Sequence, residues 1–248
     1  MKIILTGATG LVGRECIRIA LLNPQITEVI SVARRQATFP DGLPSQADKS
    51  KLKSVILDDF GSDWPAHVLE QLKGADACIW NLAVTPSKSK GMTSEELKKI
   101  NHDYPFVGLK SMLAVANSAH PFRFIYTSAA LTERDQDRAL WVMGEERKLR
   151  GTVEIELLAE AAQSKGRIEL QITKPGAITD SQTPMARRMM LPVLEAVLGL
   201  PSVHVSDIAA VELHQAMNGT GGKDVMSNAG LVELGSQALK EWKIEKCA

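Results

Sequence analysis

A glycine-rich turn near the beginning of the chain is the feature that most constrains its fold. The apolar run at residues 3–5 is followed by TGATGLVG, with Gly7, Gly10 and Gly13 at three-residue intervals, and then by helical spacing. This order predicts a strand, a tight turn and a helix. Glycine allows such a turn to reverse, to approach a pyrophosphate closely and to pack against the helix. A dinucleotide site is therefore predicted, with a purely structural glycine turn as the alternative.

The backbone amides at the start of the predicted helix, together with the positive end of its dipole, are expected to hold the diphosphate. The residues expected to contact the cofactor here are Thr6, Gly7, Thr9, Gly10, Leu11, Val12 and Gly13.

Length and composition are those of an ordinary globular α/β protein. The chain has 248 residues, 44% of them hydrophobic and 23% charged, and we expect a single domain over residues 1–248. Its 29 basic and 29 acidic residues give a formal net charge of zero. This balance argues against nucleic acid or an anionic membrane as a partner.

A cytoplasmic location is expected from two further observations. No apolar run approaches the ~20 residues of a membrane span, and the first predicted strand begins too early to leave room for a signal peptide. The three cysteines, Cys16, Cys78 and Cys247, lack metal-ligand spacing. We therefore expect no metal site, and we expect the cysteines to be small core residues.

Two arginines follow the second predicted strand, which covers residues 29–33. Arg34 and Arg35 lie about 20 residues beyond the glycines, where a site for NAD needs an acidic residue for the ribose hydroxyls. Guanidinium groups suit a 2′-phosphate instead. NADP(H) is therefore the predicted cofactor, and a solvated pair of arginines at a strand end is the alternative.

Strands and helices alternate over most of the chain. This alternation predicts a doubly wound parallel sheet. Further strands are predicted at residues 55–57, 77–80, 124–126 and 168–173. Helices are predicted at 65–73, at 94–118 with a kink or restart at Pro105, and at 138–163.

Polar and small residues follow several of these strands, where open α/β sheets bind ligands. Asp58, Asp59 and Phe60 end the third strand, and an acid there either meets the adenine or caps the next helix. Further expected cofactor contacts are Asn81, Leu82, Ala83 and Thr127, and the Ser128 hydroxyl is expected to face the reactive end of the cofactor.

The last third of the chain is less regular. The apolar stripe at residues 185–197, interrupted by Pro192, predicts a helix that packs on the core, with a substrate lid as the alternative. A strand at 203–205, a helix capped by Asp207, a hairpin-like turn at 219–222, a strand at 225–226 and a helix at 231–242 follow.

With these residues in view, the chain resembles the short-chain dehydrogenase/reductase superfamily, specifically its atypical branch of NmrA-like and HIV Tat-interacting-protein-like members. The resemblance covers essentially the whole chain. Its motifs are the TGATGLVG turn, the paired arginines, Asp59-Phe60, Ser128, the RGTVE run at 150–154 and KPG at 174–176. It implies nicotinamide contacts at Pro175, Gly176 and Ile178, and a substrate-covering segment at 179–205. It also allows a homodimer, although no face in this sequence stands out for that contact.

The chain departs from the family in its catalytic residues. Reductases of this type use a tyrosine with a lysine four residues later, but Gly108 and Ala130 lie four residues after the only two tyrosines. Alignment of RGTVE places Glu146 at the tyrosine position and Arg150 at the lysine position. A carboxylate could shuttle a proton if burial raised its pKa. The alternative is an ordinary exposed ion pair worth ~0.3–0.5 kcal/mol.

Three hypotheses for function follow. The first is an NADP(H)-dependent oxidoreductase acting on a small apolar carbonyl or enone, with Ser128, Glu146 and Arg150 as the catalytic residues. The second is a redox-inactive, NADP(H)-responsive binding protein of the NmrA type, because the tyrosine and lysine are missing. The third is a non-redox isomerase or cyclase, since fold does not decide chemistry.

Overall fold

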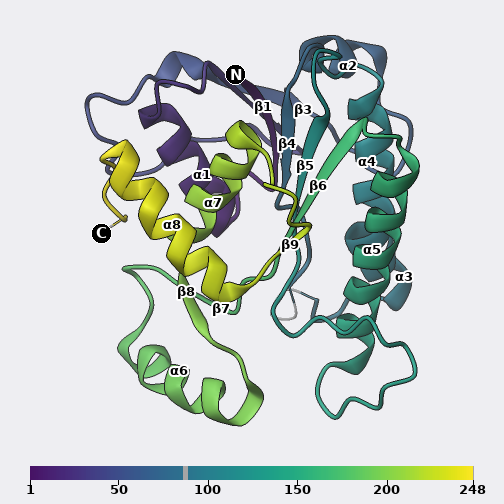
Figure 1. Cartoon of the computed structure of the whole chain (residues 1–248), viewed down its shortest axis with the longest axis vertical. Helices are drawn as coiled ribbons and strands as arrows, with labels where there is room; N and C mark the ends of the chain where they lie inside the picture. The colour runs from purple at the N-terminus through teal and green to yellow at the C-terminus, as the bar shows by residue number, and fades with distance from the viewer. Residues whose placement is uncertain (86–88, 248) are drawn as a thin grey trace.

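A seven-stranded parallel sheet forms the centre of the protein (Figure 1). The computed structural model describes residues 1–85 and 89–247. The strand order is β3-β2-β1-β4-β5-β6-β9, which confirms the predicted doubly wound sheet. The bounds are β1 (Lys2–Thr6), β2 (Glu28–Ala33), β3 (Leu52–Ile56), β4 (Ala77–Trp80), β5 (Phe122–Thr127), β6 (Ile168–Thr173) and β9 (Val225–Met226).

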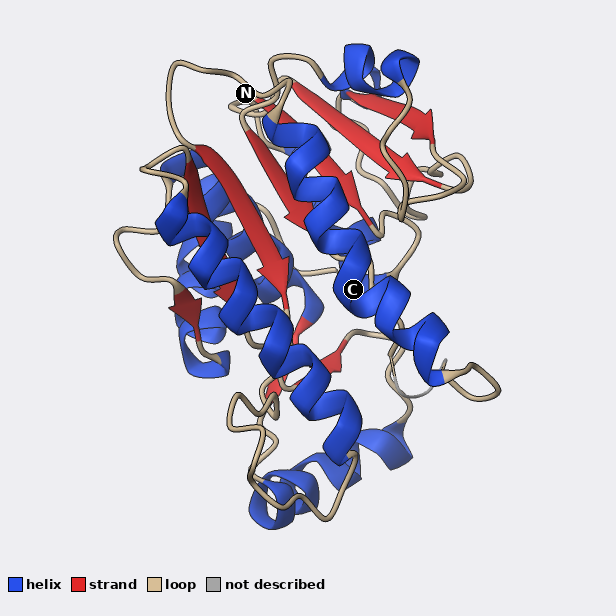
Figure 2. Ribbon diagram, turned by 90° about the vertical axis from the view of Figure 1, so that its right-hand side faces the viewer, coloured by secondary structure: helices blue, strands red, loops and turns tan. Residues whose placement is uncertain are grey.

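Helices cover both faces of the sheet, as Figures 1 and 2 show. One layer contains α1 (Leu11–Leu22), α7 (Val205–Asn218) and α8 (Asn228–Trp242), and the other contains α2 (Ala66–Leu72), α4 (Tyr104–Leu113) and α5 (Gly144–Gln163). Strand β1 shows why the sheet is buried: Ile3 and Leu5 join one core while Ile4 joins the other. Side chains alternate across a strand, and burying each one fully stabilises the fold by roughly 1.5–3 kcal/mol.

Pro105, at which the sequence predicts a kink or restart of the helix over 94–118, does not interrupt it: the helical backbone continues from Ser94 to Leu113. Helix α3 (Ser94–Lys98) continues into a π-helical turn, η2 (Lys99–Asp103), and Pro105 lies in the first turn of α4. Proline has no N–H to donate, so it is tolerated where a helix begins. The one 3₁₀ helix among the described residues, η1 (Lys49–Lys51), precedes β3.

The predicted start of the long helix at residue 138 is wrong. Helix α5 begins at Gly144, after Met143, whose φ of 51° places it in the left-handed region. A non-glycine residue in that conformation interrupts a right-handed helix. Residues 138–143 consequently form a loop, although their sequence favours a helix.

Two smaller expectations for the last third are also wrong. His204, not Asp207, caps α7, because its Nδ1 accepts from Ser206 N at 3.2 Å. The side chain of Asp207 instead accepts from Lys246 Nζ at 2.5 Å. The turn at 219–222 does not form a hairpin, because β9 pairs parallel to β6.

A small lobe extends from the carboxyl edge of the sheet (Figure 1). It consists of β7 (Ala177–Thr179), β8 (Ser202–His204) and the intervening helix α6 (Met185–Leu198). All residues of α6 are described and none is buried, so the prediction that this helix packs on the core is wrong. Strands β7 and β8 pair with each other outside the main sheet, and this pairing carries α6 away from the core.

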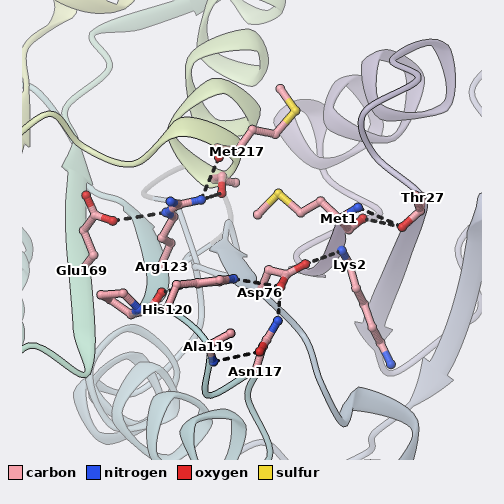
Figure 3. A network of polar contacts seen from close by, with 12 residues as sticks. Met1, Lys2, Thr27, Asp76, Asn117, Ala119, His120, Arg123, Glu169 and Met217 are labelled. Carbon is pink, nitrogen blue, oxygen red and sulfur yellow. Dashed lines mark hydrogen bonds and ion pairs between the residues drawn. The ribbon is translucent and has the colours of Figure 1, made fainter.

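At the amino edge of the sheet, a network of polar contacts links the N-terminal residues Met1 and Lys2 to the central strands (Figure 3). Asp76 accepts hydrogen bonds from Lys2 N at 2.8 Å, Asn117 Nδ2 at 2.9 Å and His120 Nε2 at 3.0 Å. Burial alone would raise the pKa of Asp76, but these hydrogen bonds outweigh it and lower the pKa. The carboxylate is therefore stabilised in its ionised form.

We expect Asp76→Asn to destabilise the protein by about 1–3 kcal/mol at neutral pH, because an amide cannot accept all three donors. Since folding lowers the pKa of Asp76, its stabilising effect is present above the unfolded-state pKa of about 4 and disappears as the pH falls through the folded-state value. Urea unfolding at several pH values measures this. The exposed control Glu70→Gln should have little effect, and a constant difference down to pH ~2 would contradict the assignment.

Candidate functional site

The ends of the parallel strands bring the predicted site residues to one edge of the sheet. Strand β1 leads into the glycine turn. Strand β4, which pairs with β1, and the next strands β5 and β6 end at Trp80, Thr127 and Thr173. The strand order reverses direction between β1 and β4. This is the position at which open α/β sheets form a ligand-binding crevice.

The three glycines of the turn have different structural roles. Gly7 has a φ of 67°, and a Cβ there would lie 2.4 Å from Asn81 O. A Cβ at Gly13 would lie 2.3 Å from Gly7 O, whereas one at Gly10 would meet only Gly7 O, at 3.2 Å. Gly7 and Gly13 are thus required by the packing of the turn itself, and Gly10 leaves open space above it.

The start of α1 is suited to an anion. Its N-cap is Gly10, no side chain caps it, and its first turn contains no acidic residue. The first hydrogen bond into the helix runs from Arg14 N to Gly10 O at 2.9 Å, so the three preceding amides are free of helical partners. Thr6 is buried beneath the turn, while Thr9 and Leu11 are exposed. The residues present therefore fit a diphosphate.

Arg34 and Arg35 are exposed directly after β2. Within the described part of the chain, neither guanidinium forms a hydrogen bond or an ion pair with the protein. Both guanidinium groups are thus exposed to solvent and available to a phosphate.

Of the two candidate residues after β3, Phe60 is buried in the core and Asp59 is exposed. Phe60 is 1% exposed and stacks on Tyr104 with ring centroids 5.7 Å apart. The Asp59 carboxylate accepts a hydrogen bond from Gly61 N at 2.9 Å, and this bond lowers its pKa. The alternative that Asp58 or Asp59 caps the next helix is wrong, because the N-cap of α2 is Pro65.

A buried carboxylate missed by the sequence analysis lies behind the ends of β4 and β5. Glu212, on α7, is fully buried, and burial raises its pKa. It accepts from Asn81 Nδ2 at 2.8 Å and from Thr127 Oγ1 at 2.6 Å. The side chains of Asn81 and Thr127 therefore face this carboxylate, while the backbone of Asn81 meets the glycine turn. Leu82 and Ala83 are half-buried.

A pocket of about 670 Å³ opens beside these strand ends. Its wall contains all three catalytic candidates, Ser128, Glu146 and Arg150, together with the three residues that the family resemblance places near the nicotinamide: Pro175, Gly176 and Ile178. The loop before α5 and the end of α6 supply most of the rest of the lining. This volume is in the range of small-molecule sites, roughly 300–1,000 Å³.

Ser128 is bonded to a second carboxylate that the sequence analysis did not assign to the site. Ser128 Oγ donates to Glu154 Oε1 at 2.5 Å, and Glu154 is fully buried on α5. Arg134 Nε and Lys174 Nζ approach the other oxygen, Glu154 Oε2, at 2.7 and 3.2 Å. The acid at the end of RGTVE thus links the pocket hydroxyl to two cations.

Glu146 and Arg150 do not form the simple ion pair considered as the alternative. Glu146 Oε1 accepts from Ser89 Oγ at 3.3 Å, and Arg150 Nη2 donates to Val84 O at 3.2 Å. No ion pair joins these two described residues. The remaining tyrosine, Tyr126, is 2% exposed, and burial raises its pKa to about 12. It is not among the described residues that line the pocket.

Among the described residues, no cluster of His, Cys, Asp and Glu could hold a metal ion. No described helix is long and apolar enough to cross a bilayer.

Known proteins resemble this chain both in sequence and in fold. A family model described as NAD(P)H-binding matches residues 7–218. The mitochondrial protein FMP52 of Candida albicans is 26% identical over 145 residues, which cover 54% of this chain and 59% of that protein. A second curated relative is matched over 42% of its own length. The chain thus spans about half the length of the curated relatives it matches.

Solved structures support the same architecture. A short chain dehydrogenase family protein from Francisella tularensis has a TM-score of 0.61 at 13% identity, covering 92% of this chain and 98% of that one. Gre2 of Candida albicans, solved in complex with NADPH, has a TM-score of 0.60 at 16% identity, covering 92% and 77%. At these identities the similarity establishes the fold alone.

Proposed function

This chain belongs to the NAD(P)H-binding family, and we propose that it is an oxidoreductase that uses NADP(H) to reduce a small apolar carbonyl compound or an enone. The observation that carries this proposal is the pocket beside the strand ends, because Ser128 lines it together with Pro175, Gly176 and Ile178. Its position at the carboxyl edge of the sheet is where a cofactor bound at the glycine turn would present its reactive end.

The residues around the turn support the cofactor assignment. The uncapped start of α1 would hold the diphosphate through the amides of residues 11–13, and Arg34 and Arg35 would hold the 2′-phosphate of NADP(H). Asp59 follows β3, the strand next to β2, and would contact the adenine.

Reduction of a carbonyl group to an alcohol adds a hydride to the carbon and a proton to the oxygen. When bound, the reduced nicotinamide supplies a hydride to the carbonyl carbon. The Ser128 hydroxyl, whose single proton is donated to Glu154 in this structure, would turn that proton to the carbonyl oxygen and pass it on as the alcohol forms. The Lys174 ammonium, 3.2 Å from Glu154 Oε2, would then supply the proton that Ser128 has lost, with Glu154 between them; this route is more direct than one through Glu146, which contacts Ser89.

A redox-inactive, nucleotide-responsive binding protein is the second candidate. It is favoured by the absence of a tyrosine–lysine pair and by the Ser128 hydroxyl, which is already bonded to Glu154. A non-redox isomerase or cyclase in the same pocket is the third. The cytoplasmic location and a homodimer also remain proposals, and the C. albicans relative is described as mitochondrial.

We expect the purified protein to consume NADPH in the presence of at least some apolar aldehydes or enones, measured as loss of the reduced-nicotinamide absorbance in a stopped-flow instrument. Ser128→Ala should lower the rate by about tenfold or more, because the proton donor is lost, without changing NADPH affinity. Tight NADPH binding with no consumption over a broad carbonyl panel would instead favour the redox-inactive candidate.

A further inference from the structure

The pocket beside the strand ends carries more positive than negative charge. Its charged lining residues are Arg138, Glu146, Arg147 and Arg150. Arg138 is neutralised by Glu133, at 2.8 Å. Arg147 and Arg150 are three residues apart on α5, so their side chains lie on the same face of the helix.

These two half-buried guanidinium groups have protein partners that are uncharged. Arg147 Nε donates to Leu131 O at 2.5 Å, and Arg150 Nη2 donates to Val84 O at 3.2 Å. Within the described residues, neither forms an ion pair with a carboxylate. A guanidinium has five N–H donors, so both arginines have donors left for a ligand in the pocket.

Large apolar side chains line the pocket from two separate segments. Trp141, in the loop before α5, is fully exposed at 101%, and Val197, on α6, is 73% exposed. Leu140, Val142, Met143, Leu198 and Leu200 extend the same lining. Exposed apolar side chains gathered around one pocket indicate a ligand with an apolar body.

We propose that the substrate of this pocket is an amphipathic carboxylate with an aliphatic body. Its apolar chain packs between α6 and the loop at 139–143, and its carboxylate is bound by Arg147 and Arg150. This inference rests on the proposed function for one feature, a carbonyl group on the substrate that reaches Ser128. A neutral ligand would fill the apolar part but leave two guanidinium groups desolvated without an anionic partner.

The test uses decanoate and its neutral counterpart n-decanol as probes, titrated calorimetrically into the full chain with and without saturating NADPH. We expect decanoate to bind about tenfold more tightly than decanol. Arg147→Gln and Arg150→Gln should each remove most of that difference while leaving decanol binding and thermal unfolding nearly unchanged. Lys148→Gln is the matched control, because it makes the same charge change on α5 outside the pocket lining, and it should preserve the difference.

Equal affinity for the two probes, or no binding of either, would overturn the proposal. An assay of NADPH consumption with ω-oxodecanoate, which carries both a carboxylate and an aldehyde, tests the redox function separately from ligand binding. Decanoate binding without reduction of ω-oxodecanoate would leave the substrate class standing and contradict the oxidoreductase. Reduction of decanal by a protein that does not bind decanoate would contradict the substrate class alone.

Discussion

Replacing Gly10 with valine is expected to abolish nucleotide binding while the protein remains folded. A Cβ at this position meets only Gly7 O, at 3.2 Å, and the φ of −82° is accessible to any residue. The valine methyl groups would instead occupy the space above the turn, where the diphosphate must approach the amides of α1. Calorimetric titration with NADPH, together with thermal unfolding, measures both parts of the prediction.

Gly144→Val provides the matched control. Gly144 is also near the start of a helix, and a Cβ there meets Leu140 Cβ at a similar 3.3 Å, but it lies on α5, away from the turn. It should leave nucleotide affinity unchanged. If Gly10→Val retained the affinity of the unmodified protein, the diphosphate could not lie over this turn.

Reversing the charge of both arginines after β2, as Arg34→Glu/Arg35→Glu, should lower the affinity for NADPH by roughly a hundredfold, because the double variant replaces charge-assisted hydrogen bonds to the 2′-phosphate with repulsion. Affinity for NADH should change far less, since its ribose carries no phosphate. Competition binding with both nucleotides gives the ratio directly.

The double variant Arg187→Glu/Lys223→Glu makes the same change in net charge at exposed positions in other segments and should preserve the preference for NADPH. Equal losses of affinity for NADPH and NADH in the Arg34/Arg35 variant would show that the arginines do not bind the 2′-phosphate. The protein would then not be selective for NADP(H) through this pair.

Sequence reasoning located the glycine turn and the sheet well because their patterns are local. The run at residues 3–5 is buried on both faces of the sheet, so it is apolar without alternation, as in other parallel strands. Strands β4 and β6 match their predicted bounds for the same reason. Pro105 lies where the π-helical turn η2 passes into α4, because the effect of its missing N–H is confined to one turn.

The lobe and the loop beside the pocket could not be derived in this way. The apolar stripe of α6 is typical of a helix that packs on a core, yet its position depends on β7 and β8 pairing with each other. Residues 138–143 favour a helix locally, but the backbone turns into the left-handed region at Met143. The position of α6 thus depends on a pairing between the two segments that flank it, and the local pattern of residues 138–143 does not reveal the turn at Met143.

The two buried carboxylates were missed for a related reason. Glu154 and Glu212 are acids in helices, where an acid is ordinarily solvated. Their partners, such as Ser128 and Lys174 for Glu154 and Asn81 and Thr127 for Glu212, come from other segments. The available hint was an acid among apolar neighbours, as in AAVEL around Glu212.

Equilibrium binding of nicotinamide dinucleotides to the unmodified chain is the most direct test of the central claim that a dinucleotide binds across the carboxyl edge of the sheet. We predict saturable binding of NADPH in the micromolar range with one site per chain, and markedly weaker binding of NADH. If neither nucleotide bound at millimolar concentration, the cofactor site and the chemistry proposed beside it would both be contradicted.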